Sequence, residues 1–266
     1  MMDDLTPLDV AHMAADAEPE DEAARLRFYG SLAESELFLL LRADAPEGPV
    51  EAIAPAIFAL EEGRFAMAFD REDRLAAFAG GPAPYAAVPG RVLVRELSGG
   101  DTGLGVNLGV APSAALLPPE VLGWLAAMLA QEPDAPPDRP LGLEPPDPAA
   151  MAMIGALTGA AATVVRHAEA AVFVTAVYLT GRRPALAIIG AAERAEAAMA
   201  QAVNDALAFS GLPAAALDVM FLSPGDLMAG TALSVGLPVS AGEPETVAAA
   251  QAVGPGMDPS RPPRLR

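Results

Sequence analysis

The sequence predicts an α+β protein, α/β-like in part, with two domains that each have a mixed, antiparallel-rich sheet and packed helices. Three observations lead to this fold class. The chain has 266 residues, more than one hydrophobic core usually holds. Short apolar runs of strand length alternate with segments of helical spacing. Residues 131–148 are rich in proline and acid, and such a stretch continues neither a helix nor strand pairing, so we expect a linker there.

The first domain is predicted over residues 22–130. Residues 1–21 before it are acidic and show no sustained period, so we expect a flexible arm. The predicted strands are 37–41, 53–60, 65–69, 92–97 and 103–110. The predicted helices are 22–35, a helix over 71–78 that Asp70 is suited to cap, and one that starts near Pro118 and carries Trp124.

The second domain is predicted over residues 149–240 and is the smaller of the two. We expect a helix from Pro148 to about residue 157 and a long helix over 191–209, in which Met199 and Val203 line the apolar side and Asp205 lies on the polar side. The predicted strands are 170–179, 185–189, 217–222 and 231–239, with a short helical turn at 224–228. Residues 241–266 are rich in proline and glycine and read as a flexible tail.

One predicted strand has an unusual face. Over residues 103–110 the alternation places apolar side chains on one side and Gly103, Gly105, Asn107 and Gly109 on the other. Glycine weakens a strand and marks a bend or the close approach of another group. We therefore expect either a packed helix or a ligand against this face.

Charge and composition exclude several classes of function. The net charge is −19, and residues 1–130 carry −13 of it, a sign that repels nucleic acid and anionic membranes and suits a basic partner. The chain has no cysteine and no lysine, which removes thiol nucleophiles, thiolate metal sites, Schiff bases and a phosphate-loop lysine. No segment resembles a signal peptide or a membrane span, so we expect a cytoplasmic protein.

Motifs for catalysis or cofactor binding are incomplete. The glycines at 103, 105 and 109 miss the dinucleotide spacing by one residue, and no helix follows at once. His167 and Glu169 resemble half of a deaminase zinc site but have no cysteine partners, and the other histidine, His12, lies in the expected arm. We therefore expect no metal and no cofactor.

The remaining acids have simple structural interpretations. Asp70 with Asp73 fits helix capping, and Glu61 with Glu62 fits a solvated turn. Asp101 stands beside the glycine strand and could serve as a base, although a surface turn is the simpler explanation. No Gly-x-Ser-x-Gly motif is present, and Ser98 belongs to a turn.

Four segments resemble the amino-terminal domain of SseB-family proteins, in their order and spacing: DREDRLAAF at 70–78, YAAVPGRVL at 85–93, GLGVNLG at 103–109 and LPPE at 117–120. Residues 184–228 are similar in layout to the carboxy-terminal domain of bacterial two-domain members. The family pattern at the glycine strand ends in Asn-Pro-Gly, where this chain has Asn107, Leu108 and Gly109. The resemblance implies no enzymatic activity.

The leading hypothesis is a non-catalytic, cytoplasmic protein that binds a partner protein or peptide. Its expected contact surface is Gly103, Gly105, Asn107 and Gly109, with Trp124 on the following helix beside it or over it. The alternative is a small carboxylate-dependent enzyme with Asp101 or Asp70 near Asn107. The sequence does not predict an oligomeric state.

Overall fold

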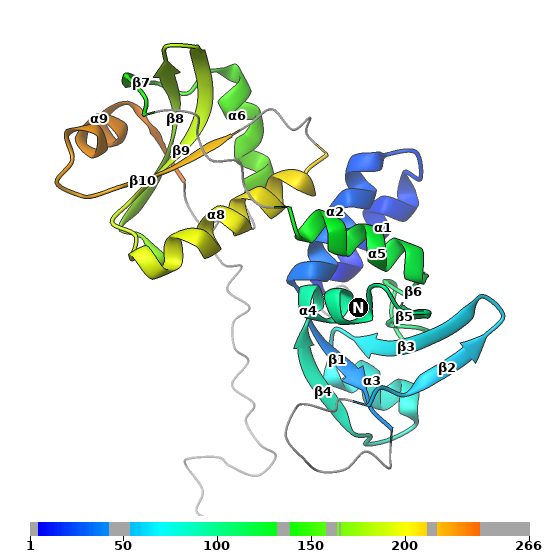
Figure 1. Cartoon of the computed structure of the whole chain (residues 1–266). Helices are drawn as coiled ribbons and strands as arrows, with labels where there is room; N and C mark the ends of the chain where they lie inside the picture. The colour runs from blue at the N-terminus through cyan, green and yellow to red at the C-terminus, as the bar shows by residue number, and fades with distance from the viewer. Residues whose placement is uncertain are drawn as a thin grey trace, which may run out of the picture.

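A computed structural model describes residues 5–42, 54–131, 139–157, 164, 166–211 and 217–239. Within these ranges the chain forms two sheets, each with helices packed against it (Figure 1). The α+β class is therefore confirmed, and both sheets are mixed and mainly antiparallel. The predicted tail 241–266, the first four residues of the predicted arm and residues 132–138 of the predicted linker lie outside the described residues.

The first sheet has the order β4-β1-β3-β5-β6. The strand β2 pairs with the first half of β3, whereas β1 pairs with the last residues of β3. Only β3 and β5 pair in parallel. The hairpin predicted around Glu61 and Glu62 is confirmed, with Leu60 opposite Gly63. Its strands are β1 (Glu36–Leu40), β2 (Ile57–Leu60), β3 (Gly63–Phe69), β4 (Tyr85–Pro89), β5 (Thr102–Val106) and β6 (Ala115–Leu117).

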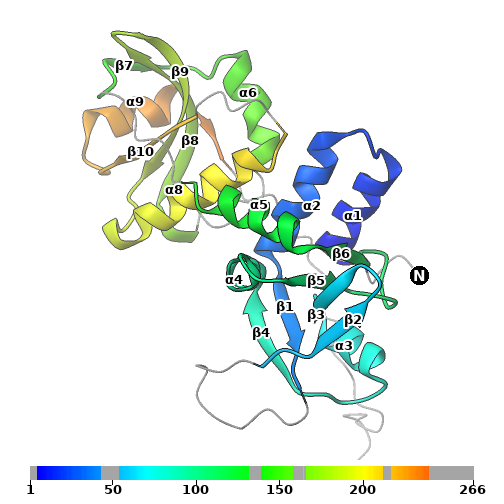
Figure 2. The same ribbon diagram turned by 45° about the vertical axis from the view of Figure 1, so that its right-hand side comes forward.

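Helices cover both faces of this sheet (Figure 2). One face packs Leu37, Leu104 and Val106 with side chains of four helices. The other face packs Phe65, Met67 and other side chains with Leu75 of a single helix. The four helices are α1 (Pro7–Ala17), α2 (Glu22–Glu34), α4 (Gly90–Leu97) and α5 (Pro119–Leu129), and the single helix is α3 (Glu72–Ala79).

The second sheet has the order β10-β9-β8-β11, and β7 pairs with β8. The helix α9 covers one face with Ala229 and Ala232, while α8 covers the other with Met199 and Val203. Its strands are β7 (Gly142–Glu144), β8 (Ala170–Tyr178), β9 (Gly181–Ile189), β10 (Asp218–Leu222) and β11 (Leu237–Pro238). Its helices are α6 (Pro148–Ile154), the 3-10 helix η2 (Gly155–Leu157), α8 (Glu193–Ala208) and α9 (Leu227–Val235).

The flexible arm predicted for residues 1–21 is wrong over its described part, because α1 lies there. A capping box starts this helix: the Thr6 side chain accepts the Asp9 N–H, and the Asp9 side chain accepts the Thr6 N–H. Pro7 occupies a first-turn position that tolerates proline. Leu8 is fully buried in the core below. Asp9, one of the acids that led to the prediction of a flexible arm, therefore caps a helix and is buried.

Three further predictions are corrected. Residues 92–97 were expected to be a strand but lie in α4, because Leu93, Val94 and Leu97 have helical spacing toward the core. Residues 231–239 are mostly the end of α9, where Ala229 and Ala232 pack on the sheet one turn apart. Part of the predicted linker is also ordered as β7, which pairs with β8.

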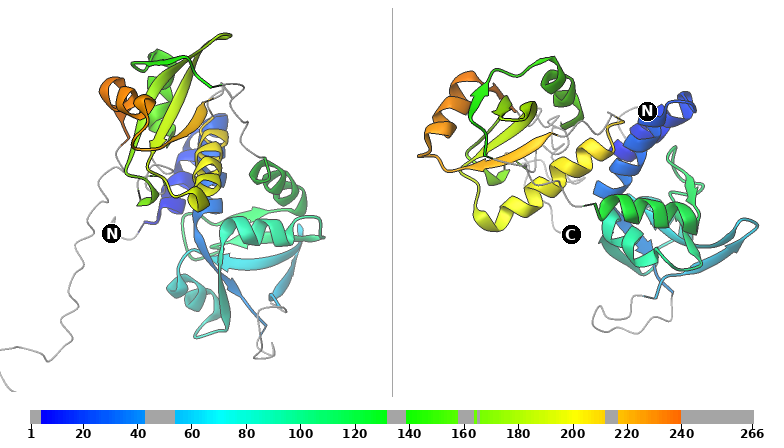
Figure 3. Two further views of the ribbon diagram at one scale, coloured as in Figure 1. Left: turned by 60° about the vertical axis from the view of Figure 1, so that its left-hand side comes forward. Right: turned by 45° about the horizontal axis from the view of Figure 1, so that its top comes forward.

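The two halves touch through α8, which contacts α2. The two helices lie side by side in both views of Figure 3. Phe209, directly after α8, belongs to the core cluster of the first half and fills the space left by Gly30. Arg91 pairs with Asp205 at 3.0 Å. This contact explains why Asp205 is buried although it lies on the predicted polar side of the helix.

Candidate functional site

The glycine face of β5 is buried by neighbouring side chains of the same sheet. A Cβ added at Gly103 would meet the Phe65 ring at 2.6 Å, and one at Gly105 would meet Met67 Sδ at 2.5 Å. Leu108 folds back over the same face, 2.9 Å from the Cβ position of Gly105. The close approach that the glycines predicted is therefore confirmed. The approaching groups are side chains of β3, Leu108 of the following turn and, at Gly103, the carbonyl oxygen of Leu117 in β6. Among the described residues, none of the atoms nearest these two Cβ positions belongs to a helix.

Asn107 directly follows β5 and is buried. Its φ of 50° is in the left-handed region, which Asn tolerates better than most residues. Its side-chain oxygen accepts the Asp70 N–H at 3.1 Å, and its side-chain nitrogen donates to Ser113 Oγ at 2.8 Å. Asn107 thus joins the end of β3 to the loop after β5 and is not available at the surface.

A buried polar network continues from Asn107. The Ser113 hydroxyl donates to Asp9, and Arg74 donates to both Asp9 and Asp70, the latter at 2.8 Å. The Thr6 hydroxyl donates to Asp70. Asp70 therefore does not cap α3 as predicted; the N-cap position is Arg71, and no side chain caps it. The network fastens α1 to the sheet and to α3.

The environment of Asp9 holds its carboxyl in the ionised form. Burial alone would raise the pKa of Asp9, but hydrogen bonds from Arg74, Ser113 and the Thr6 N–H outweigh burial and leave that pKa well below its ordinary value. The same contacts raise the pKa of Arg74 against the opposing effect of burial. The buried ion pair of Asp9 and Arg74 is therefore suited to stabilising the fold and is poorly suited to proton transfer.

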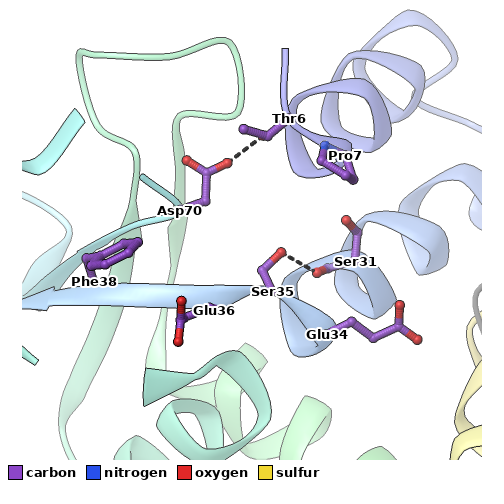
Figure 4. A pocket seen from close by; sticks show the side chains of 8 residues that line it. All are labelled: Thr6, Pro7, Ser31, Glu34, Ser35, Glu36, Phe38 and Asp70. Atoms are coloured by element: carbon purple, nitrogen blue, oxygen red, sulfur yellow. Dashed lines mark hydrogen bonds between the residues drawn. The ribbon is translucent and has the colours of Figure 1, made fainter. Parts of the chain in front are cut away.

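A hollow of about 390 Å³ opens beside Asp70, at the end of the sheet where β1 begins and β3 ends (Figure 4). Its walls come from the start of α1, the last turn of α2, the first residues of β1 and Asp70. Its lining is Thr6, Pro7, Ser31, Glu34, Ser35, Glu36, Phe38 and Asp70. The lining thus combines three carboxylates and three hydroxyls with the Phe38 ring.

The hollow has a negative potential. Within the described chain, the side chains of Glu34 and Glu36 make no hydrogen bond or ion pair, whereas Asp70 is paired with Arg74. The last turn of α2 adds the negative end of its helix dipole. Glu34 is partly exposed, and desolvation by surrounding atoms raises the pKa of its carboxyl; nearby Arg91 opposes this rise and Asp205 adds to it. A cation near Glu34 would relieve this unfavourable charge.

Comparison with known families identifies the first half of the chain. Residues 8–122 match the family model described as SseB protein N-terminal domain. This segment is an SseB N-terminal domain. It includes α1 from Leu8 onward and extends into α5. It therefore covers the polar network except Thr6, and the lining of the hollow except Thr6 and Pro7. No curated protein and no solved structure matches the chain.

The SseB domain does not gather the predicted site residues at one surface. Gly109 is exposed in a turn, with φ 71°. Trp124 is 42% exposed and packs edge-on against Tyr29 of α2, at 5.3 Å between ring centroids. Its helix packs on the face opposite the glycines, because Leu122 and Leu125 share a core with Leu104. Trp124 is therefore not brought to Gly103 and Gly105.

The acids and histidines considered for chemistry also lie apart. Asp101 pairs with Arg64 at 2.9 Å on the surface and stands at the opposite end of β5 from Asn107, about 15–20 Å away at roughly 3.3 Å per residue. Asp73 pairs with Arg71. His12 lies on α1 against Phe28, and His167 is exposed before β8.

Among the residues that the structure describes, no three or more histidines, cysteines or acids gather closely enough to hold a metal ion. None of the helices in the described part of the chain is long and apolar enough to cross a membrane.

The residues that sequence reasoning missed are Thr6, Asp9, Arg74 and Ser113. For the first two a signal was present, because Thr6 and Asp9 have capping-box spacing around Pro7. Arg74 follows Asp70 by one helical turn, which is the spacing of a helical ion pair. Nothing in the sequence pairs Ser113 with Asp9, which lies 104 residues away along the chain.

Proposed function

We propose that the SseB domain is a non-catalytic protein-binding module that holds a basic segment of a partner in the hollow beside Asp70. One observation carries this proposal. The side chains of Glu34 and Glu36 line the hollow without a hydrogen bond or ion pair to any described residue, and the ring of Phe38 lines it on the side away from Glu34 (Figure 4). Carboxylates without partners beside an aromatic ring suit a guanidinium or ammonium group.

The charge of the domain supports a basic ligand. Residues 1–130 carry −13 of the net charge of −19, so the long-range potential attracts cations and speeds their encounter. The hydroxyls of Ser31, Ser35 and Thr6 supply oxygen acceptors around the carboxylates. Phe38 is held in place by an edge-on contact with Tyr85, at 5.3 Å between ring centroids. Its fixed ring is suited to pack against the apolar stem of an arginine or lysine.

The acids favour binding over catalysis. Asp9 and Asp70, the carboxylates nearest Asn107, are both ion-paired with Arg74. A general base needs a pKa near the working pH and an accessible lone pair, and a carboxylate held in a buried ion pair is poorly suited to both requirements. No observation favours the alternative enzyme with a site near Asn107.

In this proposal Asn107 keeps a role as a positioning residue. It accepts the Asp70 N–H and so fixes the backbone from which Asp70 reaches the hollow. Gly103 and Gly105 admit the side chains of β3, which holds Asp70 at its end. Gly109 and Trp124 lie outside this surface. We further propose that the protein acts in the cytoplasm and that its two sheets belong to two domains divided within residues 131–148.

The test compares two double variants in the full chain. Glu34→Gln with Glu36→Gln removes the two unpaired carboxylates, whereas Glu61→Gln with Glu62→Gln removes the same charge at the exposed β2–β3 turn. Binding of a fluorescein-labelled arginine-rich peptide is measured by anisotropy at low and physiological salt. We expect the first variant to bind about tenfold more weakly than the second, from roughly 0.7 kcal/mol per ion pair. Equal affinities of the two variants would refute the hollow as the site.

A further inference from the structure

We infer that the acidic hollow takes a segment of this same chain, residues 261–266, and that this segment competes with basic partners. The inference rests on the proposed function, because it names an occupant for the hollow proposed there. Its consequence is regulation: a partner must displace an internal ligand before it can bind.

Charge complementarity is the first argument. The sequence RPPRLR at residues 261–266 contains three of the chain's 16 arginines and no acid. The side chains of Glu34 and Glu36 line the hollow and make no hydrogen bond or ion pair with a described residue, although Arg91 is near enough to Glu34 to oppose the rise that desolvation causes in the pKa of its carboxyl. Proline fixes φ, so a segment with two adjacent prolines loses less conformational freedom on binding than an unrestricted chain. No other stretch of six residues in the chain contains three arginines.

Chain length is the second argument. The structure describes the chain as far as Val239, and residues 240–259, twenty in all, lie between it and Ser260. Fully extended, twenty residues span up to about 70 Å. A compact protein of this length has a radius of gyration of about 18 Å, so its diameter is roughly 50 Å. The segment can therefore reach the hollow from any position of Val239.

The sequence next to the hollow does not offer a competing occupant. Thr6 lines the hollow, and the residues that precede it include Asp3 and Asp4. These acids have the same sign as the hollow and cannot neutralise Glu34 and Glu36. Tethering places the arginines of 261–266 at an effective concentration in the millimolar range, so even a weak contact would be well populated.

The first experiment measures competition in the full chain. The variant Arg261→Gln, Arg264→Gln, Arg266→Gln neutralises the segment, and Arg25→Gln, Arg95→Gln, Arg194→Gln removes the same charge from exposed helix positions as the control. The probe is a free, labelled peptide of sequence SRPPRLR. We expect the first variant to bind the probe about tenfold more tightly than the native chain, and the control to bind it less than threefold more tightly.

The outcomes separate this inference from the proposed function. If the neutralised chain binds the probe through Glu34 and Glu36 but no more tightly than the native chain, the internal ligand is refuted and the proposed function stands. If neither chain binds the probe, both proposals are refuted.

The second experiment locates the segment directly. The chain has no cysteine, so Ser260→Cys gives a single site for a nitroxide label. We expect the label to broaden the amide signals of Ser35 and Glu36, and the broadening to fall when Glu34 and Glu36 are changed to glutamine. Unbroadened signals would overturn the inference. Broadening found only between labelled and unlabelled copies would overturn it too, because the occupant would then be a second molecule.

Discussion

The main-chain N–H of Asp70 donates to the side-chain oxygen of Asn107 at 3.1 Å, and this bond ties together the ends of the parallel strands β3 and β5. Asp70, which lines the hollow, and Asn107, which follows β5, are therefore joined by a direct hydrogen bond. Asn107 does not line the hollow, and it holds in place the backbone of Asp70, which does.

We expect Asn107→Ala to destabilise the protein by about 2–4 kcal/mol. The change leaves the Asp70 N–H and Ser113 Oγ without their partner and forces alanine into a left-handed backbone. Gly109→Ala is the matched control, because its φ is also positive but an added Cβ meets nothing within 4 Å. It is expected to cost about 1 kcal/mol. Urea unfolding measures both, and equal losses would contradict the structural role of Asn107.

The ion pair between Asp9 and Arg74 predicts a dependence of stability on pH. The pKa of Asp9 is lower in the folded protein than in the unfolded chain, so the stabilisation is present above the ordinary pKa of about 4 and is lost as the pH falls below it. Asp9→Asn removes the titrating group. We therefore expect the gap in unfolding free energy between native protein and variant to shrink from pH 7 to pH 3. A gap that stays constant would show that Asp9 does not titrate with a lowered pKa.

Two glycines in helices of the first half should respond in opposite directions to alanine. A Cβ at Gly90 would overlap the carbonyl oxygen of Leu32, which is backbone and cannot move aside cheaply. We expect Gly90→Ala to cost more than about 2 kcal/mol. Gly123→Ala places its Cβ in open space on α5 and should stabilise by about 0.5–1 kcal/mol through helix propensity. Melting temperatures check both signs, and a neutral Gly90→Ala would contradict the packing of α2 on α4.

Much of the fold could be predicted from local pattern. The runs at 37–41 and 65–69 form strands, and the hairpin around Glu61 and Glu62 is present, because apolar continuity and turn residues are local signals. Residues 92–97 and 231–239 were assigned the wrong type because short apolar runs are compatible with both periods. Whether a helix or a strand forms at these residues depends on where the sheet that they pack against lies.

The candidate site was harder to predict than the fold. The glycines at 103 and 105 correctly indicated a close approach, but the approaching groups, Phe65 and Met67, come from a strand about forty residues earlier in the chain. The hollow combines Thr6, the end of α2 and Asp70, which are distant in sequence. Charge composition indicated a basic partner but could not place it, because placement requires the sheet register.

The position of Phe209 has a consequence for dissecting this protein into pieces. Its ring is counted in the core of the first half, seated where Gly30 leaves room on α2, although it is encoded some eighty residues after α5. A fragment that stops after α5 would carry an empty apolar socket on α2, and a fragment that starts at β7 would expose the ring that fills it. The second half thus completes the interior of the first, and fragments cut at the proline-rich segment would tend to associate in solution.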